Sequence, residues 1–299
     1  MDTITRKAYA KINLSLDVLR RREDGYHEVK MIMQTIDLSD ELTFTKLTAN
    51  TDSKEPAITL SVERLPENAD IGPVEKNLIY RAAKLIMEEY KVQDGVSIVL
   101  NKSIPVAAGM AGGSTDAAAV FHGLNELFSL GMSVERMCEL GVKLGADIPY
   151  CIKGGTCLSE GIGEKLTSIA TPPESVLLIA KPDIAVSTKF VYENLHANDL
   201  PKEAHPDVDA MIEALEDKDI LKMSKLLGNV LERVTVPAYP IIDEIKTMMN
   251  ENGALGSLMS GSGPTVFGLF GNDIDSARKT AKMIEEAGLS KEVFVTKFI

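Results

Sequence analysis

The sequence predicts an α+β fold with mixed and largely antiparallel sheets, divided into two lobes. Segments with the two-residue period of strands are mixed with segments of helical period, without the strict alternation of βαβ proteins. The chain has 299 residues, of which 44% are hydrophobic, and this is enough for two lobes with separate cores. We expect a domain border near 157, with domains 1–157 and 158–299.

Periodicity and turn residues place the individual elements. A Gly-containing turn follows the first expected strand, and a change from period 2 to period 3.6 marks the first helix. Residues 146–169 are rich in glycine and are expected to form strands and turns. The expected strands are 4–19, 30–47, 57–64, 95–105, 175–182, 292–299 and a strand-loop-strand over 254–270. Helical spacing is expected over 77–90, from Ser114 onward, and over 133–145, 189–195, 205–232, 239–252 and 273–288.

Composition excludes several classes of protein. The net charge of −12 disfavours general attraction to nucleic acid or an anionic membrane. No run of about 18 apolar residues is present and the N-terminus does not resemble a signal peptide, so we expect a cytoplasmic protein. The three cysteines form no CxxC pair and the histidines have no metal-ligand spacing, which predicts neither a disulfide framework nor a protein-built metal site.

The segment PVAAGMAGGSTDAAA, residues 105–119, carries the clearest chemical signal. Its loop at 107–113 has almost no side chains, so backbone N–H groups can approach an anion, and the following helix adds the positive end of its dipole. Ser114 is a suitable N-cap residue for that helix. The loop contains neither GxxxxGK[ST] nor GxGxxG. A polyphosphate site is predicted, and a plain tight turn into a closely packed helix is the alternative.

A second small-residue loop, SGSGPT at 260–265, lies between two apolar runs. Taken alone it is typical of a hairpin turn. Together with the first loop it indicates that two amide-rich loops converge on one ligand.

Two charged residues stand in apolar surroundings. Asp147 precedes Ile148 and Pro149, and a carboxylate there either holds its own turn or serves an active site. Lys11 and Asn13 are two residues apart on the first strand, so they face the same side. Lys11 then needs an anionic partner, unless that face is exposed to solvent.

Three ordered segments resemble the motifs of the GHMP kinase superfamily, and the match spans nearly the whole chain. They are residues 10–38, which begin AKINLSLDVL, the segment PVAAGMAGGSTDAAA, and residues 258–270, LMSGSGPTVFGLF. Within the superfamily, KINL with DGYHE and GADIPY is most similar to the branch that acts on 4-diphosphocytidyl-2-C-methyl-D-erythritol.

The resemblance implies ATP- and Mg²⁺-dependent phosphorylation of the 2-hydroxyl of this compound, in the non-mevalonate route to isoprenoid precursors, by a two-lobed enzyme with its active site in the cleft between lobes. It implies Asp147 and Lys11 as catalytic residues, and Asn13, Tyr26 and His27, with Asp147, as substrate-binding residues. A second aromatic for the cytosine is Phe190 or Tyr192. The implied nucleotide-binding residues are Lys102, Pro105, Ala107, Ala108, Gly109, Met110, Ala111, Gly112, Gly113, Ser114 and Thr115.

The loop departs from the family pattern at several positions. Ala107 and Ala111 stand where glycine is commoner, Met110 where leucine is usual, and Thr115 where a second serine is usual. An alanine with negative φ still presents its amide, so we expect altered loop packing with binding retained.

Other functions stay open at this point. They are a GHMP kinase for homoserine, mevalonate or a sugar, a nucleotide-binding protein of the same fold without catalysis, and a dinucleotide oxidoreductase. The partners expected are small molecules, and the protein is expected to be a monomer or homodimer.

Overall fold

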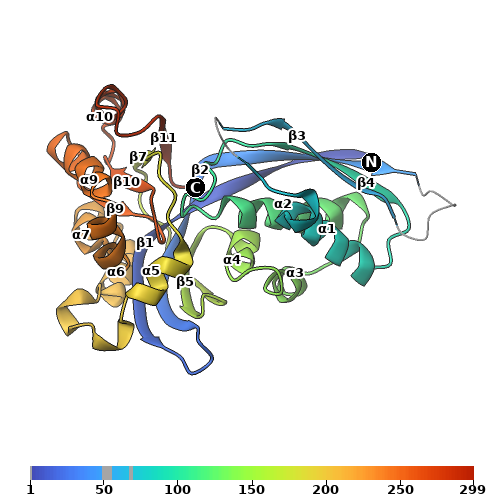
Figure 1. Ribbon diagram of the computed structural model, residues 1–299, viewed down its shortest axis with the longest axis horizontal. Helices are drawn as coiled ribbons and strands as arrows, with labels where there is room; N and C mark the ends of the chain where they lie inside the picture. Colours follow the sequence, from blue (N-terminus) through green and yellow to red (C-terminus); the bar gives the residue numbers. More distant parts are fainter. Residues whose placement is uncertain (1, 49–55, 67–69) are drawn as a thin grey trace. The chain divides into compact units, whose positions relative to one another are not determined.

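The computed structural model describes residues 2–48, 56–66 and 70–299 (Figure 1). The chain forms two compact units, and each is made of several segments because the chain passes from one unit to the other more than once. The domain ranges 1–157 and 158–299 stay a prediction. The first unit comprises Met1–Ala10, Leu38–Val106 and Ala111–Lys153, and the second comprises Lys11–Asp37, Ala107–Met110 and Gly154–Ile299.

In the first unit, helices pack on a small mixed sheet. Strand β4 pairs antiparallel with the second half of β2 and parallel with β3. Strands β1 and β2 are long enough to contribute residues to both units. The elements are β1 (Thr3–Arg21), β2 (His27–Leu47), β3 (Ile58–Arg64), η1 (Val74–Lys76), α1 (Leu78–Glu89), β4 (Gly95–Asn101), α2 (Gly112–Leu127), α3 (Val134–Gly141) and α4 (Ile148–Lys153).

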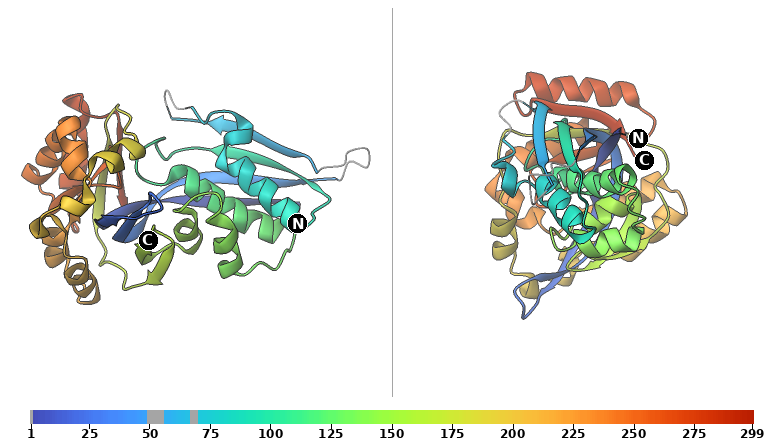
Figure 2. Two further views of the ribbon diagram at one scale, coloured as in Figure 1. Left: turned by 60° about the horizontal axis from the view of Figure 1, so that its bottom comes forward. Right: turned by 90° about the vertical axis from the view of Figure 1, so that its right-hand side faces the viewer.

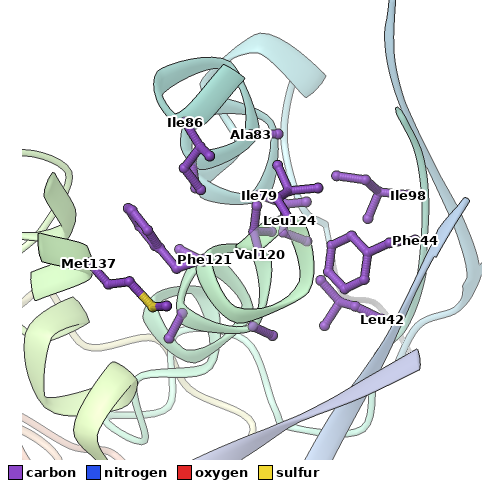
Figure 3. Packing of buried hydrophobic residues seen from close by; sticks show 14 of the residues in the cluster. Leu42, Phe44, Ile79, Ala83, Ile86, Ile98, Val120, Phe121, Leu124 and Met137 are labelled. Atoms are coloured by element: carbon purple, nitrogen blue, oxygen red, sulfur yellow. The ribbon is translucent and has the colours of Figure 1, made fainter. Parts of the chain in front are cut away.

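The core of the first unit lies between α1, α2 and the sheet (Figure 3). Phe44 of β2 is fully buried against α2. A Cβ at Gly123 of α2 would lie 2.6 Å from the Phe44 ring, so only glycine allows this approach of helix and strand. The apolar face of α2 is thereby fixed against β2, and this sets the position of the helix start.

In the second unit, helices cover a four-stranded antiparallel sheet of order β11-β7-β10-β9. The first half of β2 pairs with β5, which pairs with β6, and β1 pairs in parallel with β8. Figure 2 shows α10 running alongside β11. The elements are β5 (Thr156–Gly161), β6 (Lys165–Ser168), β7 (Val176–Lys181), α5 (Thr188–Asn194), η2 (Ala197–Asp199), η3 (Lys202–Ala204), α6 (Val208–Glu216), α7 (Ile220–Leu226), β8 (Gly228–Asn229), α8 (Glu232–Ala238), α9 (Ile241–Glu251), β9 (Gly256–Met259), β10 (Val266–Leu269), α10 (Ile274–Glu286) and β11 (Glu292–Lys297).

The α+β class with mixed and antiparallel sheets is confirmed. Two expectations were wrong. Gly228–Asn229 form the short strand β8 inside the segment 205–232 that was expected to be helical. Residues 148–153 form helix α4 within the segment expected to contain only strands and turns. Six residues are too few to show a helical period, and Pro149 is tolerated because it lies in the first turn. No helix in the described part of the chain is long and apolar enough to cross a membrane.

Candidate functional site

The glycine-rich loop ends in a helix start that offers unpaired backbone donors. Helix α2 begins at Gly112, and the first amide to reach a helical acceptor is that of Thr115, which donates to Ala111 O at 2.9 Å. The amides of Gly112, Gly113 and Ser114 therefore have no acceptor within the helix. No side chain of the described residues caps it, so Ser114 is not the N-cap and the expectation was wrong. This start can bind an anion.

The alanines of the loop do not have the negative φ that we expected. Ala107 has φ +52° and Ala111, the N-cap of α2, has φ +57°. Gly109 between them has φ +71°. The left-handed region is unfavourable for alanine by about 1–2 kcal/mol, so contacts around the loop have to select this conformation.

One such contact joins the two small-residue loops, both of which contribute to the second unit. Ser260 Oγ donates a hydrogen bond to Gly109 O at 3.0 Å. A Cβ at Gly109 would lie 2.3 Å from Ser260 O, and one at Gly261 would lie 3.1 Å from Gly109 O. The backbones touch because neither glycine has a side chain. The expected convergence of the loops is confirmed, and their common ligand stays a prediction.

Asn229 holds the second loop in place. Its Nδ2 donates to Met259 O and to Gly261 O, both at 2.8 Å, while its Oδ1 accepts from the amide of Leu231 at 3.0 Å. Sequence reasoning missed Asn229. A single asparagine after a helical segment carries no signal of its own, since its partners lie about 30 residues further along the chain.

Lys11 is buried, with 6% of its surface exposed, which excludes a solvated edge lysine. Its Nζ donates to Asn13 Oδ1 at 2.7 Å, so the two side chains lie on the same face of β1 as predicted. The amide of Lys11 also donates to Met110 O at 3.2 Å, which ties β1 to the glycine-rich loop.

Asp147 lies at the entry to α4, where its carbonyl oxygen accepts the amide of Cys151 at 3.0 Å. The residue is half-buried. It belongs to the first compact unit and Lys11 to the second. The catalytic roles of these two residues stay a prediction.

Aromatic side chains gather near the turn between β1 and β2. The rings of His27 and Tyr192 lie 5.0 Å apart between centroids, tilted by 48°. Burial, with a smaller contribution from the charge of Arg21, lowers the pKa of His27, which favours the neutral imidazole. Tyr26 is 60% exposed. Of the two aromatics suggested by the sequence, the structure brings Tyr192 to His27, and Phe190 is 41% exposed.

Two of the predicted nucleotide-binding side chains, those of Thr115 and Lys102, have partners within the protein. Thr115 Oγ1 donates to Tyr9 O at 2.7 Å. Lys102 Nζ donates to Asp116 Oδ2 at 2.9 Å and also to Asp40 Oδ2. Pro105, Ala108 and Met110 are buried, whereas Ala107 and Gly113 are exposed. Contact of these residues with a nucleotide stays a prediction.

Two family models match parts of the chain. The model of the GHMP kinases N terminal domain matches residues 77–155, and that of the GHMP kinases C terminal matches 202–288. A protein of Lachnoclostridium phytofermentans named 4-diphosphocytidyl-2-C-methyl-D-erythritol kinase is 50% identical over 298 residues, covering 100% of this chain and 98% of the relative. A protein of the same name from Bacillus subtilis is 51% identical over 266 residues, 89% of this chain and 88% of the relative.

Solved structures show the same fold. A crystal structure of 4-(cytidine 5'-diphospho)-2C-methyl-D-erythritol kinase superposes with a TM-score of 0.80 at 31% identity, covering 99% of both chains. A mevalonate kinase from L. major gives a TM-score of 0.76 at 19% identity, covering 99% of this chain and 97% of the other, and shares the fold alone. The chain belongs to the GHMP kinase family, within the branch whose relatives are named 4-diphosphocytidyl-2-C-methyl-D-erythritol kinase.

Proposed function

We propose that this protein transfers the γ-phosphoryl group of ATP to the 2-hydroxyl of 4-diphosphocytidyl-2-C-methyl-D-erythritol. The observation that carries the proposal is the start of α2, where the amides of Gly112, Gly113 and Ser114 lack helical acceptors. The choice of acceptor is supported by full-length relatives that bear this substrate in their names.

Phosphoryl transfer needs positioning and charge stabilisation more than covalent chemistry by the protein. The three amides and the helix dipole stabilise the charge of the phosphate oxygens. Asp147 accepts the proton of the acceptor hydroxyl late in the reaction. Lys11 supplies positive charge, and its hydrogen bond to Asn13 orients the ammonium.

We expect magnesium to bind together with the nucleotide and not at a site built by protein side chains. Among the described residues there is no group of three or more His, Cys, Asp or Glu side chains that could hold a metal. Mg²⁺ in kinases is bound mainly through substrate phosphates and water. When bound, it neutralises phosphate charge, and no protein residue is assigned as its ligand.

The acceptor half of the proposal uses the second unit. His27 and Tyr192 lie in ring contact, and the exposed Tyr26 is the neighbour of His27 in the chain. Such an aromatic group can stack on a pyrimidine, since every base offers a π-face. We propose that it binds the cytosine and that Asn13 contributes a polar contact. A cytoplasmic monomer or homodimer remains our prediction.

The test is ADP release with the purified protein and Mg-ATP. The cytidine-diphosphate compound is compared with 2-C-methyl-D-erythritol 4-phosphate, homoserine and mevalonate. ADP release with the first compound alone is expected. Equal or faster turnover of homoserine or mevalonate would overturn the assignment of the acceptor. ATP binding without turnover of any of the four would contradict a kinase function for these acceptors.

A further inference from the structure

Three charged side chains of the first unit form a buried cluster, which we call the acid-lysine cluster. It consists of Asp40 in β2, Lys102 just after β4, and Asp116 in α2. Their side chains are 0%, 5% and 4% exposed, respectively. The Lys102 ammonium lies between the two carboxylates, and Asp40 Oδ1 accepts from the amides of Ser103 and Ile104 at 2.6 and 2.8 Å. Three separate chain segments are therefore joined at one point.

The charges of the cluster balance within it. Burial, together with the nearby charge of Asp40, raises the pKa of Asp116 to about 8, although Lys102 acts in the opposite direction. Burial opposes the charge on Lys102, but the two carboxylates outweigh it and raise its pKa. The raised pKa favours the protonated form of Asp116, so the cluster holds less negative charge than two free acids would. Lys102 thus has its counter-charge inside the protein.

The cluster lies directly beneath the first residue of α2. A Cβ at Gly112 would lie 3.3 Å from Lys102 Nζ and 3.1 Å from Ile104 Cγ2. The backbone of Gly112 therefore sits close to the ammonium, and Asp116, one turn further along the helix, is bound to the same atom. The first turn of α2 is therefore packed against the cluster and bonded to it.

We propose that Lys102 is a positioning residue that acts through Asp40 and Asp116 to fix the amide-lined start of α2 for the phosphates of ATP. The inference rests on the proposed function. It gives Lys102 a different task from the nucleotide contact that the family resemblance implies. The Lys102 ammonium is enclosed by two acids, so it does not contact the nucleotide. It holds in place the helix start whose backbone amides do.

The first test is a double-mutant cycle on the Kd of Mg-ATP, measured by isothermal titration calorimetry without acceptor. Lys102→Met leaves the buried carboxylate of Asp40 without its cation, and we expect a Kd roughly tenfold higher or more in protein whose circular dichroism is native. Lys102→Met combined with Asp40→Asn removes that buried acid, and we expect it to recover at least about threefold of that loss. A double variant that binds ATP no better than Lys102→Met would overturn the proposal, because a direct nucleotide contact would not be restored by changing Asp40.

A second pair of variants leaves Lys102 intact. Asp116→Asn keeps an oxygen that accepts from the ammonium, and Asp116→Leu removes it. We expect the Kd of ATP to change by at most about threefold for the first and to rise roughly tenfold for the second. An unchanged Kd in folded Asp116→Leu would show that the cluster serves folding only, and would end the proposal.

The matched control is Lys84→Met. Lys84 lies on α1 of the same unit, and its exposed ammonium pairs with Glu88 at 3.7 Å. This variant should bind ATP like the wild type. Because calorimetry with ATP uses no acceptor, the outcome is separate from that of the ADP-release assay, which tests the acceptor.

Discussion

The hydroxyl of Ser260 and the carbonyl oxygen of Gly109, which are 151 positions apart in the chain, form a 3.0 Å hydrogen bond. The bond joins the two loops that the sequence singled out for their small residues. It depends on the absence of a side chain at Gly109, whose Cβ would collide with Ser260 O. Because of this contact, the conformation of the glycine-rich loop depends on the SGSGPT loop as well as on its own residues.

Gly109→Ala should therefore be more harmful than an ordinary glycine substitution. The new Cβ lies 2.3 Å from a backbone oxygen, and φ +71° is unfavourable for alanine. We expect at least about 2 kcal/mol of destabilisation by urea unfolding and roughly tenfold weaker ATP binding.

Gly131→Ala is the matched control. Gly131 has φ +65°, but its Cβ would meet open space. This variant should lose only the stability of about 1–2 kcal/mol that a positive φ costs alanine, and it should bind ATP like the wild type. Equal losses in the two variants would mean that the contact with Ser260 has no effect.

Ala111→Gly tests the strain at the start of α2. Alanine at φ +57° is in a region that glycine enters freely. Glycine removes the cost of positive φ, and this gain offsets the greater entropy that glycine has in the unfolded chain. We therefore expect the free energy of unfolding to rise by between zero and about 1 kcal/mol. Ala281→Gly in the interior of α10 should instead lose about 1 kcal/mol. If Ala111→Gly lost as much stability as Ala281→Gly, Ala111 would not be strained in the native structure.

The two loops could be predicted because a backbone that approaches an anion or another backbone closely must consist of small residues. Gly109 and Gly261 show this composition in the sequence itself. The face of β1 could be predicted as well, since Lys11 and Asn13 obey the two-residue period of strands.

Other features could not be read from the chain. The positive φ of Ala107 and Ala111 is selected by tertiary contacts against the preference of alanine itself. Asp40 and Asp116 are 62 and 14 positions from Lys102, and each is an unremarkable acid in its own segment. Their meeting follows from the packing of α2 on the sheet, which local patterns do not encode.

Asp147→Asn should separate catalysis from nucleotide binding. Asparagine is similar in size but cannot take up the proton of the substrate hydroxyl. We therefore expect turnover to fall roughly 10²- to 10⁴-fold with little change in ATP affinity. ADP release at saturating substrate and calorimetry with ATP measure the two quantities. Turnover at the wild-type rate would remove the assignment of Asp147 as the base.

Asp116 should make stability depend on pH. Its folded pKa of about 8 lies above the ordinary value of 3.8, so between these values the folded protein holds a proton that the unfolded chain has released. The contribution of this group is therefore fully present below about pH 4 and is lost as pH rises toward 8. The slope for one proton is at most about 1.4 kcal/mol per pH unit.

Urea unfolding at several pH values from 5 to 9 checks this slope. The groups facing the Asp116 carboxyl are Lys102 and Asp40, and both are kept in Asp116→Asn. The free energy of unfolding of the wild type minus that of Asp116→Asn should decrease with rising pH and level off above 8. A difference that is flat or increasing across this range would mean that Asp116 is already ionised in the folded protein.

Tyr192 should matter for the acceptor and not for ATP. Its ring lies 5.0 Å from that of His27, whereas Phe190, two positions earlier in α5, is 41% exposed. Stacking of a base on an aromatic ring contributes about 1–3 kcal/mol, so Tyr192→Leu should raise the KM for the cytidine-diphosphate compound by roughly 5- to 150-fold. Phe190→Leu removes an aromatic of similar size from the same helix and should raise it by less than about threefold. The KM for ATP should stay constant in both variants. If the effects of the two were reversed, the cytosine would stack on Phe190, and the contact between Tyr192 and His27 would serve only to hold α5 against the turn between β1 and β2.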